Sequence, residues 1–489
     1  MAINKNFLLN ALLKENFFPF QKKRKEELPP VFTSSKLSKV IANDIHKVAL
    51  SGDRKKLGGF DVVQYKATRF NNVPRLLSIP HPKPYIDICF EIFDNWNKIK
   101  HICSNSNSLI CPRMHADGRT LIMDYEGPLI ERNRYYKLAF GKKFLAHTDI
   151  ANCFPSLYSH ALPWALVGFI SAKNNRTSTT WFNKIDTCFR YCSRNETAGV
   201  PIGPATSNIA CEIILERIDR KLRNKFQYVR FIDDYTAYCK THTDAEEFIR
   251  QLSLELMKYK LNLNIKKTEI KKLPQAVSEE WVNRIREVIP DDREINASKV
   301  SHILDAAVRL QRDNPDGSIL KYAANSILRK LNNSSSVEFT KYVIKLCFHY
   351  PVLIPTLKNP LSRVYKNRAG IFNKELRFLL KDSISYGRSD AACWLLYYLK
   401  ILHNDVSDKI ANKVVEWGDC MTLTLLAEFL AHENKVIKFA KQLNKNDLYE
   451  LDTYWLLLYQ LYFKGKIKNL YNDSTFNVLK KHGVTFINI

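Results

Sequence analysis

Two adjacent aspartates, Asp233 and Asp234, lie in an apolar, β-favouring segment, Tyr228-Val-Arg-Phe-Ile-Asp-Asp-Tyr235. These flanks predict a tight hairpin with the acid pair at its tip. Adjacent carboxylates repel by roughly 4 kcal/mol at about 4 Å and an effective dielectric near 20. A solvated turn tolerates that repulsion, whereas beside an apolar hairpin it indicates a divalent cation. This segment alone leaves both interpretations open.

A third aspartate, Asp149, ends a strand-like segment over residues 142–150. Two-metal phosphoryl transfer needs carboxylates that hold two cations about 3.5–4 Å apart. Asp149 and Asp233 supply the minimum number of carboxylates for such a site, and Asp234 is a nearby third. Mg²⁺ prefers oxygen ligands and keeps several waters, so a few carboxylates suffice. The sequence therefore predicts catalytic metal ligands at all three aspartates, for Mg²⁺ with Mn²⁺ as the alternative ion.

The elements around these aspartates predict how they are positioned. The order from residue 142 to residue 265 is strand, helix, helix, β-hairpin, helix, strand, with the last strand over 261–265. A proline- and glycine-rich turn over 199–207 leads into a helix expected to turn Glu212 and Glu216 outward. Thr243 and Glu246 have the spacing of a capping box. This order fits a split βαβ arrangement in which Asp149 lies beside the hairpin tip.

Beyond about residue 296 helical patterns dominate and strand signals nearly vanish. Three similar segments contain Leu395, Leu425 and Leu456, which are 30 and 31 residues apart. A regular helical period predicts stacked helix pairs, as in an α-solenoid. The predicted fold class is thus α+β, followed by an all-α helical-repeat region.

Charge and apolar runs limit the class of function. The 489 residues include 75 Lys and Arg against 49 Asp and Glu, a formal charge of +26. Such an excess favours a nucleic acid partner, because basic side chains bind polyanions by releasing counterions; a generally basic proteome is the alternative. No apolar run reaches the ~20 residues of a membrane helix, and the 11 scattered cysteines fit a reducing compartment. We therefore expect a cytoplasmic protein without a membrane partner.

Four segments in order carry a family resemblance. They are His147-Thr-Asp-Ile-Ala-Asn-Cys-Phe-Pro-Ser156, Val200-Pro-Ile-Gly-Pro-Ala-Thr-Ser207, Phe231-Ile-Asp-Asp234 and Leu263-Asn-Ile-Lys-Lys-Thr268. Together they resemble the palm motifs of reverse transcriptases, over about residues 60–300. The resemblance implies right-hand fingers and palm. It divides the chain into an N-terminal extension (1–60), fingers (61–148), palm (149–295) and a thumb-like, helical-repeat region (296–489).

The resemblance also implies roles for single residues. Asp149, Asp233 and Asp234 would bind the metals, and Phe154 would lie under the sugar, where an aromatic ring disfavours a ribose 2′-hydroxyl. Gly203 would let the backbone approach the template or the incoming base. Lys267 would protonate or neutralise the leaving pyrophosphate. The triphosphate would contact the backbone of the motif after Asp149 and two cations of the fingers: Ile150, Ala151, Asn152, Cys153, Phe154, Lys66 and Arg75.

The helical array behind the palm, and the segment Glu27-Leu-Pro-Pro-Val-Phe32, resemble bacterial defence-associated reverse transcriptases of the abortive-infection type. That resemblance implies an anti-phage RNA-directed DNA polymerase that uses dNTPs. It further implies that the partner is an RNA, either a template or a dedicated noncoding RNA, and that the product is DNA. Template-independent and protein-primed synthesis are variants within this group. The resemblance also implies a homo-oligomer, either a trimer or a hexamer. Two alternatives stay open. One is an RNA-directed RNA polymerase, against which Phe154 argues, and the other is a noncatalytic RNA-binding scaffold with a relict palm.

Overall fold

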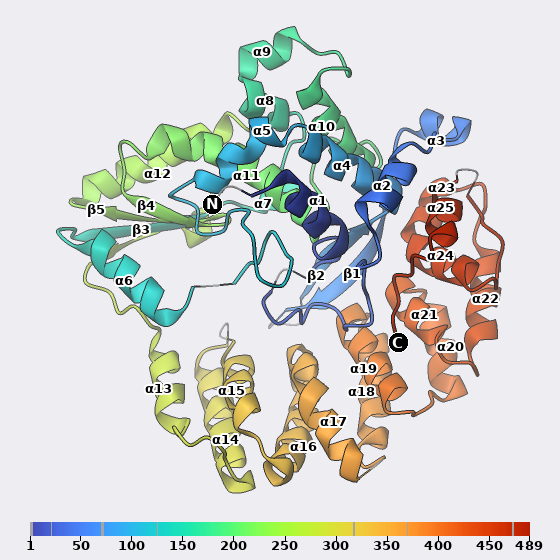
Figure 1. The fold of residues 1–489 in the computed structure, drawn as a ribbon. Coiled ribbons are helices and arrows are strands. Elements are labelled where there is room, and N and C mark those ends of the chain that lie inside the picture. Colours follow the sequence, from blue (N-terminus) through green and yellow to red (C-terminus); the bar gives the residue numbers. More distant parts are fainter. Residues whose placement is uncertain are drawn as a thin grey trace.

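A four-stranded antiparallel sheet forms the centre of the predicted palm (Figure 1). The computed structural model describes residues 3–20, 22–69, 73–124, 126–315, 318–368, 370–471 and 474–489. The strand order is β4-β5-β3-β6, and the strands are β3 (Phe144–Asp149), β4 (Tyr228–Phe231), β5 (Asp234–Cys239) and β6 (Glu269–Lys272). One face of the sheet is covered by α12 (His242–Met257), which packs on β3 and β5 and against α11 (Ala205–Leu222). Alternate strand residues such as Tyr235 and Ala237 are fully buried, so the predicted sheet backed by helices is confirmed.

A two-stranded antiparallel ribbon precedes the palm. It consists of β1 (Val62–Thr68) and β2 (Pro74–Pro80), and its register sets Ala67 opposite Arg75. Helix α4 (Pro82–Asp94) follows with prolines in its first turn, where a missing N–H costs little. The other elements of the first 267 residues are α1 (Lys5–Lys14), α2 (Lys39–His46), α3 (Gly52–Leu57), α5 (Trp96–Ile99), η1 (Lys100–Ser104), α6 (Pro128–Ala139), α7 (Cys153–Ser156), α8 (Ala161–Val167), α9 (Phe169–Asn174), α10 (Trp181–Tyr191) and η2 (Ile265–Lys267).

Three local predictions are wrong, and longer-range contacts explain the first and the last. Residues 261–265 form no strand. Leu263 makes an isolated bridge with Ile150, and the chain then turns through η2 into β6. The capping box uses Thr241 and Asp244, two residues earlier than predicted. Glu212 and Glu216 are buried at 3% exposure rather than solvated, because arginines reach them from β4 and from the end of α11.

The region after β6 is helical, as predicted. Its elements are α13 (Glu280–Val288), α14 (Ala297–Asp313), α15 (Ile319–Ile327), η3 (Leu328–Lys330), α16 (Asn333–His349), η4 (Pro351–Leu357), α17 (Lys358–Asn367), α18 (Asn373–Ser385), α19 (Ser389–Ile401), α20 (Asp408–Trp417), α21 (Cys420–Leu426), α22 (Glu433–Gln442), α23 (Leu448–Thr453), α24 (Trp455–Phe463) and α25 (Thr475–Lys481). The similar segments around Leu395, Leu425 and Leu456 lie on α19, α21 and α24. Each of these helices packs on the next, as a repeat requires.

The helical array curves back onto the start of the chain (Figure 1). Helices α19, α21 and α23 pack against β1, and Phe32 forms a bridge with Ile487 near the C-terminus. Arg54 and Asp452 form a buried bidentate ion pair, with nitrogen–oxygen distances of 2.7 and 2.8 Å. The array and the sheet region therefore share one hydrophobic core. Within the described residues, no helix combines the length and the apolar character needed to cross a membrane.

Candidate active site

The acid pair spans the end of a two-residue hairpin turn and the start of β5. Phe231 pairs with Asp234 across β4 and β5, so Ile232 and Asp233 form the turn itself. Ile232 has a φ of 60°, a left-handed conformation that is rare for a β-branched residue. Such a residue costs of order 1–3 kcal/mol and persists only where surrounding contacts enforce it. The tip is thus held in one strained conformation.

Arg230, in β4, supplies those contacts. Its guanidinium is fully buried and donates to the Ile232 carbonyl at 2.6 Å. It also donates to both carboxylate oxygens of Glu212, at 2.7 and 3.0 Å, and to Asp219 at 2.8 and 3.0 Å. Tyr228 and Asn105 donate to Asp219 as well. This buried network ties the turn to α11.

Sequence reasoning missed the network, although a signal was present. Arg230 and Tyr228 are two residues apart in an otherwise apolar strand, so their side chains lie on the same, buried face. A buried guanidinium needs carboxylate partners. Glu212 and Asp219 are seven residues apart and therefore lie on one face of α11. What the sequence does not show is that this face meets β4.

Asp149 reaches the same point from β3. It is the direct cross-strand partner of Asp234, and the Ile150 N–H donates to the Asp233 carbonyl at 3.2 Å. Directly opposed strand residues have Cβ atoms about 4.5–5.5 Å apart. The structure therefore brings together the three aspartates that the sequence singled out, at the end of one sheet.

The electrostatics of this end are unfavourable to negative charge. Burial, then the charges of Asp234 and Asp149, raise the pKa of Asp233 to about 6, against the smaller opposing effect of Arg75. Burial and then Asp149 also raise the pKa of Asp234, whereas His147 and Lys267 lower it. Three carboxylates that repel one another in a partly buried place are stabilised by an added cation.

Lys267 lies at the same end of the sheet. Its Nζ donates to Asp149 Oδ2 at 2.6 Å, and this hydrogen bond is the main cause of its raised pKa. Its side chain is 62% exposed, so the contact is a weak, solvent-screened ion pair. The backbone explains the placement, because Asn264 N–H donates to the Asp149 carbonyl and starts the turn that carries Lys267.

The fit of these carboxylates to a metal ion can be tested on their atoms. Asp149 Oδ1 is buried and has no hydrogen-bond partner, so this carboxylate oxygen is available to coordinate a cation. Carboxylate oxygens are the ligands that Mg²⁺ prefers. Across the residues that the structure describes, no group of three or more His, Cys, Asp and Glu side chains already has metal-binding geometry. The donor set therefore fits a divalent cation in chemistry, and the metal-ligand assignment stays a prediction.

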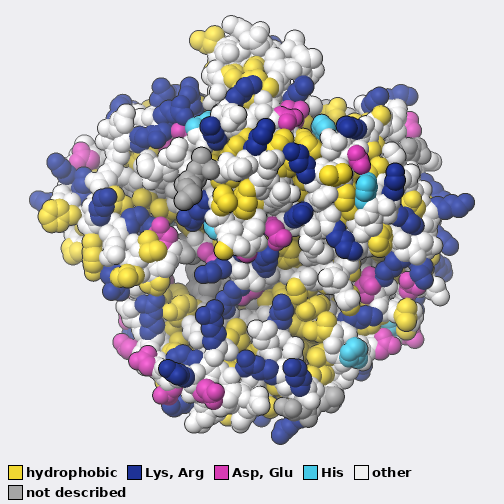
Figure 2. Space-filling view, viewed as in Figure 1, with side chains coloured by type: hydrophobic (Ala, Val, Ile, Leu, Met, Phe, Trp, Pro, Cys, Tyr) yellow, Lys and Arg dark blue, Asp and Glu magenta, His cyan; other side chains and the backbone are white. Residues whose placement is uncertain are grey.

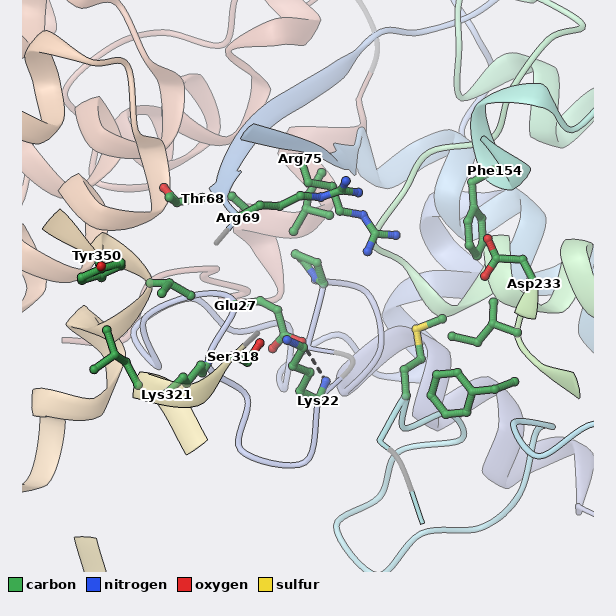
Figure 3. Close-up of a pocket in the computed structure, with 18 of the residues that line it drawn as sticks. Lys22, Glu27, Thr68, Arg69, Arg75, Phe154, Asp233, Ser318, Lys321 and Tyr350 are labelled. Carbon is green, nitrogen blue, oxygen red and sulfur yellow. Dashed lines mark hydrogen bonds between the residues drawn. The ribbon is translucent and has the colours of Figure 1, made fainter. Parts of the chain in front are cut away.

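A cavity of about 640 Å³ opens beside Asp233 (Figure 3). Phe154 and Asp233 line it on the palm side, and Arg69 and Arg75 line it at the end of the β1–β2 ribbon. The N-terminal segment contributes Lys22 and Glu27, and the helical array contributes Lys321 and Tyr350. Four cations thus face two carboxylates. Burial and the neighbouring Arg69 lower the pKa of Arg75, so an anion between the two guanidiniums would relieve their repulsion.

Of the two fingers cations predicted to grip phosphates, the structure brings only Arg75 to the cavity. Lys66 lies on the other face of the ribbon, where its Nζ lies 4.0 Å from the position of a Cβ built on Gly387. Strand alternation turns Lys66 away from its neighbour Ala67, which is opposite Arg75 and lines the cavity. Arg69, which sequence reasoning missed, lines the cavity in its place.

The motif after Asp149 is only partly available to a ligand. The N–H groups of Ile150 and Ala151 donate to the carbonyls of Asp233 and Asn262, so these two amides already have protein partners. Asn152 has a φ of 46° and precedes the short helix α7, and the Cys153 thiol packs 3.5 Å from that of Cys211. Of the five residues, Phe154 alone lines the cavity.

Gly203 allows a close backbone approach, but the neighbours are parts of the chain itself. Its φ is 143°, and a Cβ there would lie 3.1 Å from both Pro19 Cβ and the Ser78 carbonyl. The Ser78 N–H donates to the Ile202 carbonyl at 2.7 Å. Gly203 therefore lies against the N-terminal segment and β2, and its template contact stays a prediction.

Comparison with known proteins assigns the domain that contains this site. Residues 97–302 match the family model described as reverse transcriptase (RNA-dependent DNA polymerase). This part of the chain is a reverse transcriptase domain, and the enzyme class that it defines is a nucleotidyltransferase, an RNA-directed DNA polymerase. The match covers less than half of the chain. No curated protein matches the chain in sequence.

Two solved structures show a distant likeness. The apo telomerase from Candida tropicalis is 11% identical over 80% of this chain and 69% of its own, with a TM-score of 0.31. The telomerase from Candida albicans, in complex with a fragment of telomeric RNA, is 12% identical over 81% and 68%, with a TM-score of 0.30. At these scores the likeness carries no argument.

Proposed function

We propose that this protein elongates DNA from deoxynucleoside triphosphates on an RNA template. The observation that carries the proposal is the meeting of Asp149, Asp233 and Asp234 at one end of the sheet, where Asp233 lines a cavity that Arg69, Arg75 and Phe154 also line. An acidic end suits divalent cations, and a basic wall opposite suits a triphosphate. The proposed domain boundaries are those of the sequence: extension 1–60, fingers 61–148, palm 149–295 and helical region 296–489.

The proposed metal ligands are Asp149, Asp233 and Asp234. Bound Mg²⁺, or Mn²⁺ in its place, would lower the pKa of the attacking 3′-hydroxyl and neutralise the leaving pyrophosphate. Ionised Asp233 is required for binding, so its raised pKa makes the site sensitive to pH. The orphan Oδ1 of Asp149 supports the assignment.

The remaining cavity residues hold the nucleotide. Arg69 and Arg75 bind the β- and γ-phosphates by charge-assisted hydrogen bonds, the role predicted for Lys66 and Arg75. Lys267, already beside the carboxylates, protonates or neutralises the pyrophosphate as it leaves. The backbone of Asn152 to Phe154 lies beside the triphosphate, and Gly203 serves the template only if Pro19 and Ser78 move away from it.

Phe154 selects deoxyribose by occupying the space of a 2′-hydroxyl. Its buried ring lines the cavity beside Asp233 (Figure 3), which supports this role. An RNA-directed RNA polymerase is the alternative from the same carboxylates. The Phe154→Ala variant separates the two, because a gate gives way to ribonucleotide incorporation when the ring is removed. If the Phe154→Ala variant does not gain ribonucleotide incorporation, the gate assignment is contradicted.

A double variant tests the proposed function directly. Asp233→Asn together with Asp234→Asn removes two of the three charges and keeps the side-chain volumes, so the protein should fold and lose incorporation of labelled dNTPs. The matched control is Asp291→Asn with Glu294→Gln, which removes two exposed carboxylates between α13 and α14. Continued synthesis by the first variant would refute the catalytic assignment. A wild-type protein that incorporates nothing on any RNA would instead favour the noncatalytic RNA-binding scaffold.

We further propose that the enzyme acts in bacterial anti-phage defence, by the abortive-infection route. The support is the resemblance of a palm followed by a helical array, together with the +26 charge that suits a dedicated noncoding RNA. Template-independent or protein-primed synthesis, and assembly into a trimer or hexamer, belong to the same proposal. Digesting labelled products with protease, RNase and DNase distinguishes these modes of synthesis, and light scattering gives the oligomer mass.

A further inference from the structure

A second concavity lies at the edge of the palm sheet, away from the active site. It has a volume of about 620 Å³ and lies between helix α6, the turn that follows α11, and edge strand β4. Tyr228, which lines it, is five residues before Asp233 on the hairpin, a separation of roughly 17 Å at about 3.3 Å per strand residue. We call this concavity the basic cleft.

The charge of the basic cleft is of one sign. Five of its lining side chains are cationic and none is a carboxylate: Arg134, Lys137, Lys142, Arg223 and Lys225. Arg134 pairs with Glu126 and Arg223 with Glu216, both outside the lining. Lys137, Lys142 and Lys225 form no ion pair with any residue that the structure describes. Cations this close repel one another, so an anion bound among them lowers the energy of the site.

Helix α6 gives independent support, because it packs only at its margin against the part of the chain that the structure describes, through Tyr135 on Tyr238 of β5. None of its residues is buried, while Leu129 and Tyr136 are 68% and 60% exposed and Phe140, just after the helix, is 87% exposed. Its attachments include a hydrogen bond from the Tyr135 hydroxyl to the Gln275 carbonyl. In Figure 2, hydrophobic side chains gather on the left, where Figure 1 places α6 and the strand ends. A helix of this length is marginal in water by itself, so a bound partner would stabilise it.

We propose that the basic cleft binds the sugar-phosphate backbone of single-stranded RNA, at a site separate from the catalytic cavity. The proposal rests on the proposed function in one respect, the choice of RNA, because RNA is the strand that such an enzyme copies. Phosphates pair with Lys137, Lys142 and Lys225, and the half-buried ring of Phe226 offers a stacking surface. One RNA strand is long enough to occupy the cleft and the cavity together.

The test is a charge reversal with a matched control. The variant is Lys137→Glu, Lys142→Glu and Lys225→Glu in the full-length chain. The control is Lys409→Glu, Lys438→Glu and Lys441→Glu, which changes the net charge equally at exposed positions of the helical array. The probe is a short fluorescein-labelled oligouridine, measured by anisotropy at several KCl concentrations without dNTPs. Circular dichroism and thermal melting check that both variants fold.

The cleft variant should bind the oligouridine at least tenfold more weakly than wild type, with the control within twofold. The slope of log affinity against log salt should shrink by about 2, because each phosphate contact to a single strand contributes ~0.7. Hydrogen exchange of α6 should slow when wild-type protein binds the probe. Three outcomes would each overturn the proposal. They are equal weakening of binding in the control, tighter binding of an oligothymidine DNA of the same length, and a changed oligomer mass in the cleft variant alone.

Failure here is distinguishable from failure of the proposed function. The same binding measurements on the Asp233→Asn, Asp234→Asn background require no catalysis, so the cleft is tested even in an inactive protein. Conversely, an enzyme that incorporates dNTPs but binds oligouridine equally well with and without the cleft cations would refute only the cleft.

Discussion

The central cavity and the basic cleft have similar volumes, about 640 and 620 Å³, and different charge compositions. The cavity combines Asp233 and Glu27 with four cations, whereas the cleft contains cations alone. Phosphoryl transfer needs both signs, carboxylates for metal ions and cations for the transferred phosphates. Holding a nucleic acid backbone needs only positive charge. The charge composition of each concavity therefore separates a candidate for chemistry from a candidate for binding.

The two regions also differ in rigidity. The turn at Asp233 is fixed by a fully buried arginine and held in a strained backbone conformation. The wall of the cleft is a helix that buries none of its residues. Catalytic groups must be held within about 0.5 Å of productive geometry, whereas backbone contacts to an unstructured strand tolerate movement. Substitutions should therefore affect the two regions in different ways.

The largest effect is expected at Arg230. Arg230→Leu leaves Glu212 and Asp219 buried without a counter-charge, and breaking such a cluster costs about 3–5 kcal/mol of unfolding free energy. Arg230→Lys keeps the charge but loses the bidentate contacts, so the protein should fold and lose about 100-fold in incorporation rate as the turn shifts. Urea denaturation and single-nucleotide incorporation measure the two effects.

No substitution of a basic-cleft residue should lower the free energy of unfolding as Arg230→Leu does. The Lys137→Glu variant is the control, because this side chain is exposed and a surface change of this kind alters stability by no more than about 0.5 kcal/mol. An Arg230→Lys protein with full activity would show that the turn does not depend on its guanidinium.

The next effect separates the arginines of the cavity from Lys66. Arg75→Ala or Arg69→Ala should raise the KM for dNTPs about tenfold or more, because a hydrogen bond to a charged group contributes ~1.5–3 kcal/mol. Lys66→Ala should leave this KM within twofold, since Lys66 lies on the other face of the ribbon. The cleft variant should also leave it unchanged. Steady-state kinetics on a short template and primer supply the measurement, and a Lys66 effect as large as that of Arg75 would return Lys66 to the triphosphate site.

The smallest effect is a pH-dependent change in stability at Asp233. Its pKa is raised from a usual value of 3.8 to about 6 in the folded protein, so folding takes up a proton between these values. The charged group therefore destabilises the fold above about pH 6, and this penalty disappears as the pH falls below about 4. Asp233→Asn should raise the unfolding free energy at pH 7, without metal, by about 1–2 kcal/mol.

Thermal melts in EDTA at pH 7 and below pH 4 test this sign. The gain should be present at the higher pH and absent at the lower one, where both proteins are neutral at this position. Added Mg²⁺ should stabilise wild type more than the variant. A variant that is less stable than wild type at pH 7 would show that the turn needs the carboxylate for structural hydrogen bonding.

The sequence predicted the acid hairpin, the strand ending at Asp149 and the change to helices after the palm, because these depend on short-range patterns. The apolar, β-favouring residues on both sides of Asp233 and Asp234 predict a hairpin without reference to distant segments. The order of the motifs then allowed Asp149 to be paired with that hairpin. Even the helical repeat was visible, since Leu395, Leu425 and Leu456 are spaced 30 and 31 residues apart.

Other features of the site depend on which surfaces meet. The helical pattern predicts that Glu212 is solvated, but the structure buries it. The reason is that Arg230, 18 residues further along the chain, lies in a strand that packs against it. Arg69 replaces Lys66 because the register of β1 against β2 sets which strand face turns toward the cavity. No local pattern contains that register.

The amino-acid sequence alone supplied the residues on which the proposed chemistry rests, namely three aspartates, the aromatic ring of Phe154 and an excess of positive charge. Tertiary structure alone decided which cations face those carboxylates, which acids are buried beneath them, and that α6 and β4 enclose a wall of cations. The physical reason is range: backbone preference and periodicity act over a few residues, whereas burial and charge pairing are settled only when distant segments pack.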